Sequence, residues 1–399
     1  MRYPSKRLLA ATLGLPLLAA AFAAAQSEPR SEPAKTRPSN PPQVAKADAV
    51  PAKADPVKDA PAKDLSAIPP KPGPVKYTEL KKTLWPPKAG VKTPGVQIPI
   101  TNLKPEAEIP LAATPGVFLF TTDQVLIPIP TEDQIARVES KSNKVLEPIS
   151  GVLKPCGGAA SAFRNLWVVS CGSQILARLE TATGKSVASI ATGSGTASSA
   201  VASSPDSVWM LSDDKTTLTR IDPEKNSIVS EVRLAASCQS IMYADNSLWV
   251  TCPGEKRIIR FNPQTNLVIA RIEVTPEPVS IAFGGAVAAE NSIWVLSRTQ
   301  GKVARIDPKT NKVIATIDLG FTNVDGNLAF GDGFVWVSAA GFPITKISTQ
   351  MEKEKVVQQF AGDGGGQIYF GLNSIWLINA AYNNVWRLDT KRIAATLAE

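Results

Sequence analysis

The chemistry open to this sequence is limited first by what it lacks, because its 399 residues include no histidine. Ser-His-Asp and Cys-His catalysis, histidine-ligated zinc and histidine-bound haem all need an imidazole near neutral pH. Carboxylate, lysine, tyrosine and metal-carboxylate chemistry remain, as does binding without catalysis. We therefore predict no catalytic residue, no metal ligands and no cofactor from the sequence.

The four cysteines form two pairs with similar spacing around a tryptophan. The first cysteine of each pair lies eleven residues before it, and the pairs are Cys156 and Cys171 around Trp167, and Cys238 and Cys252 around Trp249. In an oxidising compartment, four cysteines favour two disulfides. The matching offsets predict two local bonds within a repeat rather than a thiolate metal site, since the pairs lie two repeats apart.

The cysteines and tryptophans lie within an internal sequence repeat, which sets their positions in the fold. The strings SVWMLSDDKTTLTRIDPEKNSIVSEV and SIWVLSRTQGKVARIDPKTNKVIATI are two copies of one unit, and five further units align with them. Their anchor residues are spaced by 41, 42, 40, 45, 42 and 40 residues, and are Leu126, Trp167, Trp209, Trp249, Trp294, Trp336 and Trp376. The chain therefore holds seven units of about 42 residues.

Each unit contains four short apolar runs separated by turn residues, such as LAFG, FVWVSA, ITKIS and KVVQQF in the sixth. Four strands in a period of this length are typical of a propeller blade. The sequence therefore predicts an all-β fold, a seven-bladed β-propeller of four-stranded antiparallel blades. We expect the segments AEIPLA at 107–112 and RIAATLA at 392–398 to meet as outer strands in the seventh blade and close the ring.

An arginine follows the tryptophan by eleven residues in five units, as in Trp294 and Arg305. A hairpin between the two places them opposite each other on one face, where the guanidinium can stack on the indole. We interpret the pair as structural rather than as an anion-binding ring. The following turn carries only Asn or Gly at one position, which predicts a positive φ there: Asn143, Gly184, Asn226, Asn266 and Asn311.

The unit WVLSRTQGKVARIDPKTNKVIATIDLG at 294–320 resembles the bacterial YVTN-type repeat and, more broadly, the seven-bladed family that contains virginiamycin B lyase. The resemblance covers roughly residues 115–399. It implies the propeller fold, and for the antibiotic lyases it implies catalysis by a histidine with a metal ion on one face of the disc. Because this chain has no histidine, that activity maps onto none of its residues.

Ligands are expected on the face where the connections between blades meet the turns between second and third strands, because these loops escape the repeat pattern. The polar residues there are Asp213, Asp214, Lys215, Glu255, Lys256, Arg298, Gln300, Tyr382, Asn383, Asn384, Asn323, Asp325 and Asp363. The candidate ligand-binding residues among them are Arg298, Tyr382, Asn323, Asp325 and Asp363. A solvated rim without a ligand is the alternative interpretation.

The first 93 residues differ from the rest in composition. Residues 1–25 have the basic, apolar and small-residue regions of a cleavable signal peptide, and residues 26–93 form a Pro/Ala/Lys-rich segment expected to be disordered. These segments carry net charges of +3 and +6, whereas residues 94–399, the expected propeller, carry −1. This balance argues against nucleic-acid binding. No later segment approaches a transmembrane run.

These features together predict a periplasmic or secreted propeller that acts as a binding or interaction module. Its partner would be a small molecule, a cell-envelope polymer or a protein on the loop face. Two alternatives stay open, a metal- and carboxylate-dependent lyase or hydrolase of the virginiamycin B lyase-like superfamily, and a structural protein of the cell envelope. A cluster of three or more carboxylate or amide groups at the channel mouth would favour the enzyme.

Overall fold

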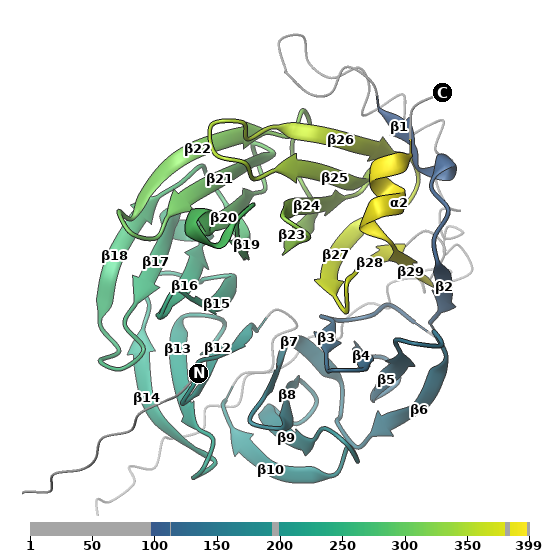
Figure 1. Cartoon of the computed structure of the whole chain (residues 1–399). Helices are drawn as coiled ribbons and strands as arrows, with labels where there is room; N and C mark the ends of the chain where they lie inside the picture. Colours follow the sequence, from purple (N-terminus) through teal and green to yellow (C-terminus); the bar gives the residue numbers. More distant parts are fainter. Residues whose placement is uncertain (1–96, 112, 194–198, 380–383, 397–399) are drawn as a thin grey trace, which may run out of the picture. The chain divides into compact units, whose positions relative to one another are not determined.

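The computed structural model describes residues 97–111, 113–193, 199–379 and 384–396. Within them, seven sheets, antiparallel apart from one short parallel pair, are arranged around a central opening (Figure 1). This confirms the predicted seven-bladed β-propeller. The predicted signal peptide and the Pro/Ala/Lys-rich segment lie outside the described residues.

Each blade runs from an innermost to an outermost strand in chain order. Blade one consists of β3 (Leu119–Phe120), β4 (Gln124–Ile129), β5 (Gln134–Glu139) and β6 (Val145–Ser150). Blade two consists of β7 (Pro155–Ala162), β8 (Asn165–Ser170), β9 (Ile175–Glu180) and β10 (Ser186–Ala191). Blade three consists of β11 (Val201–Ser203), β12 (Val208–Ser212), β13 (Thr217–Asp222) and β14 (Ser227–Arg233). Blade four consists of β15 (Ser240–Ala244), β16 (Ser247–Cys252), β17 (Arg257–Phe261) and β18 (Val268–Glu273). Blade five consists of β19 (Pro278–Gly284), β20 (Ser292–Ser297), β21 (Lys302–Asp307) and β22 (Lys312–Asp318).

The last two blades also use strands from the start of the described chain. Blade six consists of β23 (Gly326–Gly331), β24 (Phe334–Ala339), β25 (Phe342–Ser348) and β26 (Val356–Ala361), with β1 (Ile98–Pro99) added in parallel to β26. Blade seven consists of β27 (Gly366–Gly371), β28 (Ser374–Asn379) and β29 (Asn384–Leu388), and β2 (Ala107–Pro110) is its outer strand.

Burial along the strands explains the repeat pattern. The second strands are buried at every residue, as in β20 with the sequence SIWVLS, or at every residue after the first, because adjacent blades cover both of their faces. Outer strands alternate, as in β14, where every second side chain is exposed. The continuous apolar runs around each anchor tryptophan are therefore strands in the interior of the stack, while the half-polar runs form its rim.

The pairing of β2 with β29 confirms one part of the prediction about ring closure, and the helix that follows β29 corrects the other part. β2 pairs antiparallel with β29, with Ile109 opposite Val385, as expected for the N-terminal strand. The segment predicted as a second outer strand at 392–398 is instead helical over α2 (Thr390–Ala395). β2 already occupies the edge of β29, and Asp389 caps the helix by accepting a hydrogen bond from the Lys391 amide. Pro110 is tolerated because its strand is an edge strand.

The tryptophan–arginine pairs are also confirmed, and they have a further contact. Trp249 lies opposite Arg260 in the ladder, and the guanidinium carbon is 4.6 Å from the ring centroid. The same guanidinium donates to the Pro308 carbonyl oxygen and, at 2.9 Å, to Oδ1 of Asn311 in the next blade. Asn311 has the predicted positive φ, 57°. Each such arginine therefore joins its own blade to the following one.

Equivalent contacts recur around the ring. Arg178 of blade two donates to Asn226 of blade three at 2.7 Å. Arg387 of blade seven donates to Asn143 of blade one at 2.8 Å, across the point where the ring closes. These arginines are held by neighbouring blades, which agrees with the structural interpretation of the pair.

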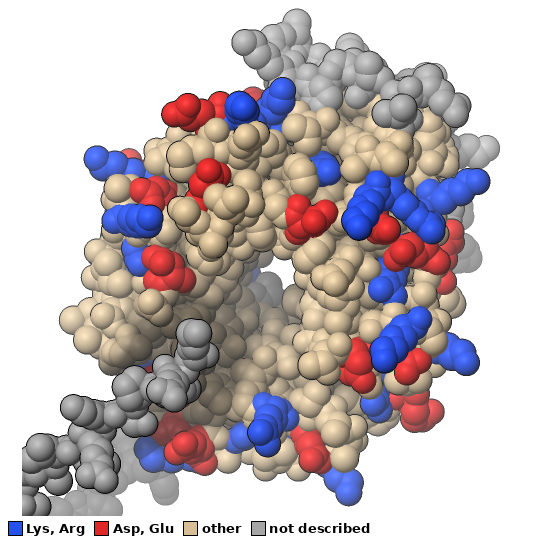
Figure 2. Space-filling view, viewed as in Figure 1, with Lys and Arg blue, Asp and Glu red and all other residues tan. Residues whose placement is uncertain are grey.

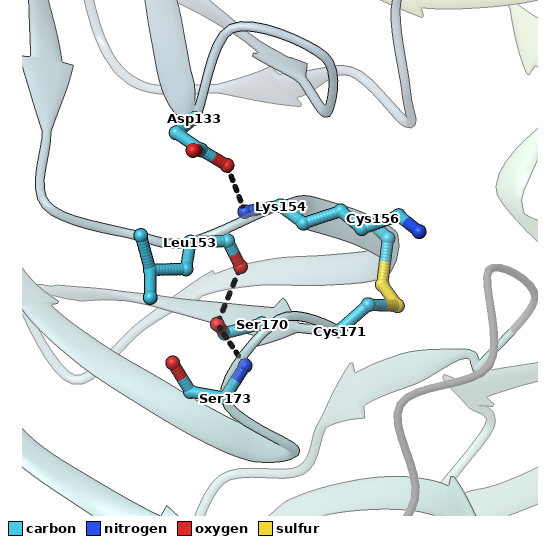
Figure 3. The surroundings of a disulfide bond; sticks show 7 residues. All are labelled: Asp133, Leu153, Lys154, Cys156, Ser170, Cys171 and Ser173. Atoms are coloured by element: carbon cyan, nitrogen blue, oxygen red, sulfur yellow. Dashed lines mark hydrogen bonds between the residues drawn. A yellow bond between two sulfur atoms is a disulfide. The ribbon is translucent and has the colours of Figure 1, made fainter.

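Both predicted disulfides are present. Cys156 is bonded to Cys171, with their Cα atoms 5.8 Å apart, and Cys238 is bonded to Cys252. Figure 3 shows the first bond beside the residues that hold its strand end, where the Ser170 hydroxyl donates to the Leu153 carbonyl oxygen at 2.6 Å. Each bond links the start of an innermost strand to the end of the second strand. None of the helices in the described ranges is long and apolar enough to cross a membrane.

Candidate functional site

A polar cavity of about 570 Å³ occupies the centre of the propeller. Its walls come from the innermost strands of blades two to seven, together with Val117 and the Arg298 turn. In Figure 2 the opening is bordered mostly by uncharged surface, and charged side chains lie further out. Small residues allow the strands to converge, since a Cβ on Gly326 would lie 1.9 Å from the Ser338 carbonyl oxygen.

Three polar side chains in this wall join neighbouring blades. The Ser240 hydroxyl donates to the Val279 carbonyl oxygen at 2.7 Å. The Ser280 hydroxyl accepts a hydrogen bond from the Leu328 amide, and Asn327 Oδ1 accepts one from the Ile368 amide. Because these groups already hold adjacent innermost strands together, they are structural, and the remaining polar groups of the wall are the candidates for contact with a ligand.

Arg298 is the first of these candidates. It follows β20 at the turn between the second and third strands of blade five, and its backbone is fixed on both sides. Its amide donates to the Glu277 carbonyl oxygen at 2.9 Å, and its carbonyl oxygen accepts from the Val324 amide at 3.0 Å. The side-chain Nε is buried and makes no hydrogen bond to any described residue. A fixed backbone thus holds at the cavity wall an arginine whose buried Nε has no partner among the described residues.

Gly301 allows the connection between blades five and six to lie against this turn. Its φ is 58°, and a Cβ at this position would lie 1.6 Å from the Phe321 carbonyl oxygen. Phe321 stacks on Phe342 with ring centroids 4.3 Å apart, and Val324 is buried. The connection is therefore packed against the blade, and it places Asp325 in the wall of the same cavity as Arg298.

Lys215, in the equivalent turn of blade three, is a second cation near this cavity. Its Nζ donates to Oε1 of Gln239, a cavity residue, at 3.2 Å. Burial lowers the pKa of the Lys215 ammonium, and the positive charge of Arg298 lowers it further, while Asp214 acts in the opposite direction. Because Gln239 and Arg298 line the same cavity, this hydrogen bond brings the turn of blade three to the cavity that the turn of blade five also borders.

Tyr369 and Gln367, both on β27, complete the polar wall. The Tyr369 hydroxyl donates to Oε1 of Gln367, and its ring stacks on Phe118 with centroids 4.7 Å apart. Burial raises the pKa of the Tyr369 phenol well above its usual value. The phenol therefore remains protonated at neutral pH and acts here as a hydrogen-bond donor.

The five predicted ligand-binding residues do not share one place. Arg298 and Asp325 both line the central cavity. Asn323 is exposed on the connection with a φ of 56°, and its amide donates to the Thr299 carbonyl oxygen. Asp363 is half-buried, outside the cavity lining, and its Oδ1 has no hydrogen-bond partner among the described residues. Tyr382 lies outside the described residues.

Sequence reasoning placed Lys215 on the loop face but did not select it, and it missed Gln239, Gln367 and Tyr369. The glutamines lie at or beside the start of innermost strands, where the repeat alignment shows no common residue type. Only knowledge that these positions face the axis could have selected them. Asp325 is the one acid in the cavity lining as described, and no group of three or more Cys, Asp and Glu residues within the described ranges is placed to hold a metal.

A larger hollow of about 800 Å³ lies elsewhere on the molecule. It is lined by residues of β1, β25, β26 and the end of α2. Lys346 in its wall is almost fully buried, with its Nζ 3.8 Å from the centroid of the Phe334 ring. Burial lowers the pKa of this lysine, against the effect of Asp332. This hollow contains none of the predicted ligand-binding residues.

No protein-family model matches the chain, and no curated protein matches it in sequence. Several solved structures share its architecture. A streptogramin B lyase is 16% identical with a TM-score of 0.59, over 70% of this chain and 96% of the lyase. BamB from Moraxella catarrhalis is 12% identical with a TM-score of 0.53, over 72% of this chain and 98% of BamB.

A catalytically inactive histidine-to-alanine variant of virginiamycin B lyase from Staphylococcus aureus, solved with quinupristin, is 16% identical. Its TM-score is 0.56, over 70% of this chain and 97% of the lyase. At these identities the likeness is one of fold alone. The chain shares the overall fold of these three proteins.

Proposed function

We propose that this protein is an exported binding module whose ligand occupies the mouth of the central cavity. The observation that carries the proposal is the backbone-fixed Arg298, whose buried Nε has no hydrogen-bond partner among the described residues, in a cavity that also holds Asp325. A buried donor without a partner costs free energy, which a ligand can recover. The cavity volume of about 570 Å³ falls within the range of small-molecule sites.

Export is supported by two independent features. The two disulfides favour an oxidising compartment such as the periplasm or the extracellular space. Residues 1–25 have the composition of a signal peptide. Peptide mass mapping of the protein from its native host should find a mature N-terminus near residue 26.

Lyase chemistry is the weaker candidate. The staphylococcal lyase is inactive when one histidine is replaced, and this chain contains no histidine. We expect no turnover of a streptogramin lactone, with or without magnesium. Turnover that disappears in Asp325→Ala would replace the binding proposal with an enzymatic one.

A thermal-shift screen tests the binding proposal. The purified protein is melted with peptidoglycan fragments, neutral and acidic saccharides, and short peptides, because a ligand that binds the folded state raises the melting temperature. A ligand at the cavity should lose its effect in Arg298→Ala and Gln239→Ala. It should keep its effect in Glu231→Ala, an exposed acid on outer strand β14. Stabilisation unchanged in both cavity variants would place the ligand elsewhere and overturn the proposal.

A further inference from the structure

We propose that the ligand of this cavity carries a single carboxylate, held by Arg298 and Lys215, on a neutral body that forms hydrogen bonds. This inference rests on the proposed function and names the chemical class of its ligand. It is argued from the two cations at the mouth, the acid beside them and the polar wall behind them.

The arrangement of Arg298 favours a planar anion. A guanidinium presents its donors in a rigid fork that matches the two oxygens of a carboxylate. Most arginines of the blades have that fork occupied, as Arg260 does by Asn311 and Asp245. The Arg298 side chain forms no hydrogen bond or ion pair with any other residue in the described ranges, and its backbone is fixed by Glu277 and Val324.

Lys215 supplies the second positive charge. Its ammonium is half-buried and is bonded to a neutral amide, Gln239, rather than to a carboxylate. The charge of Arg298 acts unfavourably on it. An anion that contacts both cations would relieve this repulsion and use the donors that each still has.

Asp325 limits the charge of the ligand. It lines the same cavity and is exposed, and Asp214 is close enough to Lys215 to affect its pKa. These two acids repel a ligand with two negative charges more strongly than a ligand with one. This balance favours a monoanionic carboxylate over a phosphate dianion.

The rest of the wall fits a neutral, polar body. Gln239 and Gln367 offer amide donors that no described residue uses, and the Tyr369 hydroxyl lies beside Gln367. Hydroxyl and amide groups are the partners that such side chains select. Acid sugars and peptide C-termini both combine a carboxylate with such a body.

Calorimetric titration with matched pairs of probes tests the inference. One pair is glucuronate and glucose, and the other is N-acetyl-alanyl-alanine and its C-terminal amide, all at constant ionic strength. We expect the acid of at least one pair to bind at least tenfold more tightly than its neutral match, and the pair that responds distinguishes a sugar from a peptide source. Glucose 6-phosphate should bind more weakly than glucuronate.

Variants connect this preference to the two cations. Arg298→Ala and Lys215→Ala should each reduce the affinity for the acid at least tenfold and leave the neutral probe unchanged. Arg271→Ala, an exposed arginine on outer strand β18, should change neither. Circular dichroism and melting temperature establish that each variant is folded.

The remaining outcomes separate this inference from the proposed function. Equal binding of acid and neutral probes would overturn the carboxylate and leave a binding site at the cavity. If glucose 6-phosphate binds more tightly than glucuronate, the proposal that the ligand carries a single negative charge is wrong. If all four matched probes fail to bind, the carboxylate class is wrong, and the thermal-shift screen with its cavity variants still decides whether the cavity binds a ligand.

Discussion

Arg260 of blade four donates a hydrogen bond to Oδ1 of Asn311 in blade five, over 2.9 Å and across 51 residues of sequence. The same arginine lies over Trp249. One side chain thus packs within its own blade and bonds to the next. The asparagine has two roles, because it adopts the positive φ that its turn requires and accepts this charged hydrogen bond.

Replacing Asn311 by glycine should separate these two roles. Glycine adopts the positive φ, so only the hydrogen-bond acceptor is lost. We expect Asn311→Gly to lower the free energy of unfolding by about 1.5 to 3 kcal/mol, the range of a hydrogen bond to a charged group. Urea denaturation measures this change.

Asn373→Gly is the matched control, since Asn373 is exposed with a φ of 57°. Its effect should stay within about 0.5 kcal/mol. Equal losses in the two variants would show that the bond between blades contributes nothing measurable.

The disulfides should contribute separately to stability. They span 15 and 14 residues, and the chain-entropy model gives about 3 kcal/mol for loops of this size. We expect Cys156→Ser/Cys171→Ser and Cys238→Ser/Cys252→Ser each to lower the melting temperature, and the double-pair variant to lower it further. Mass spectrometry of the unreduced protein should find the two local pairs; a peptide joining Cys156 to Cys238 would contradict the structure.

Gly301→Ala should disturb both the fold and the cavity mouth. The added methyl would overlap the Phe321 carbonyl oxygen and strain a residue with φ of 58°. We expect a loss of about 2 to 4 kcal/mol, from overpacking together with the cost of the left-handed conformation. Because the Arg298 turn must then move, binding of the acidic probe should also weaken.

Gly333→Ala provides the control for backbone strain. Its φ is 77°, and a Cβ there meets no atom within 4 Å. We expect only the conformational cost, about 1 to 2 kcal/mol, with binding unchanged. If Gly301→Ala behaves like Gly333→Ala in both measurements, the contact with Phe321 does not position Arg298.

Lys346 should make stability depend on pH in the alkaline range. Burial holds its pKa in the folded protein below the usual 10.5, so between those two values the unfolded chain binds more protons. The stability of the protein relative to Lys346→Met should therefore rise as the pH increases toward 10.5. Denaturation of both proteins at several pH values above 7 measures the difference; a difference that does not change with pH would contradict this assignment.

The sequence predicted those features that repeat and those that are local. The anchor tryptophans, the arginines opposite them and the positive φ of the turn asparagines recur at fixed spacing within one hairpin, so the alignment contains them. The bond from Arg178 to Asn226 crosses 48 residues and was not predicted, because spacing within a unit gives no information on how neighbouring units pack. The candidate site was predicted only in part for the same reason. Arg298 and Asp325 were selected by residue type, whereas Gln239 and Tyr369 take part through their position near the axis.

The helix at the C-terminal end shows a further limit. The alignment assigns a fourth strand to every unit, and RIAATLA occupies that place in the last one. A strand needs a free edge, and β2 already covers β29. The alanine-rich segment forms a helix that buries Ile393 instead.

The pairing of β2 with β29 also has a consequence for biosynthesis. Glu108 and Asn384, which are hydrogen-bonded across this pair, are separated by 276 residues. At about 5 to 20 residues per second, the ribosome makes the partner strand roughly 15 to 55 s after β2 has emerged. Throughout that interval β2 lacks its partner strand, and a chain truncated before β29 lacks it permanently.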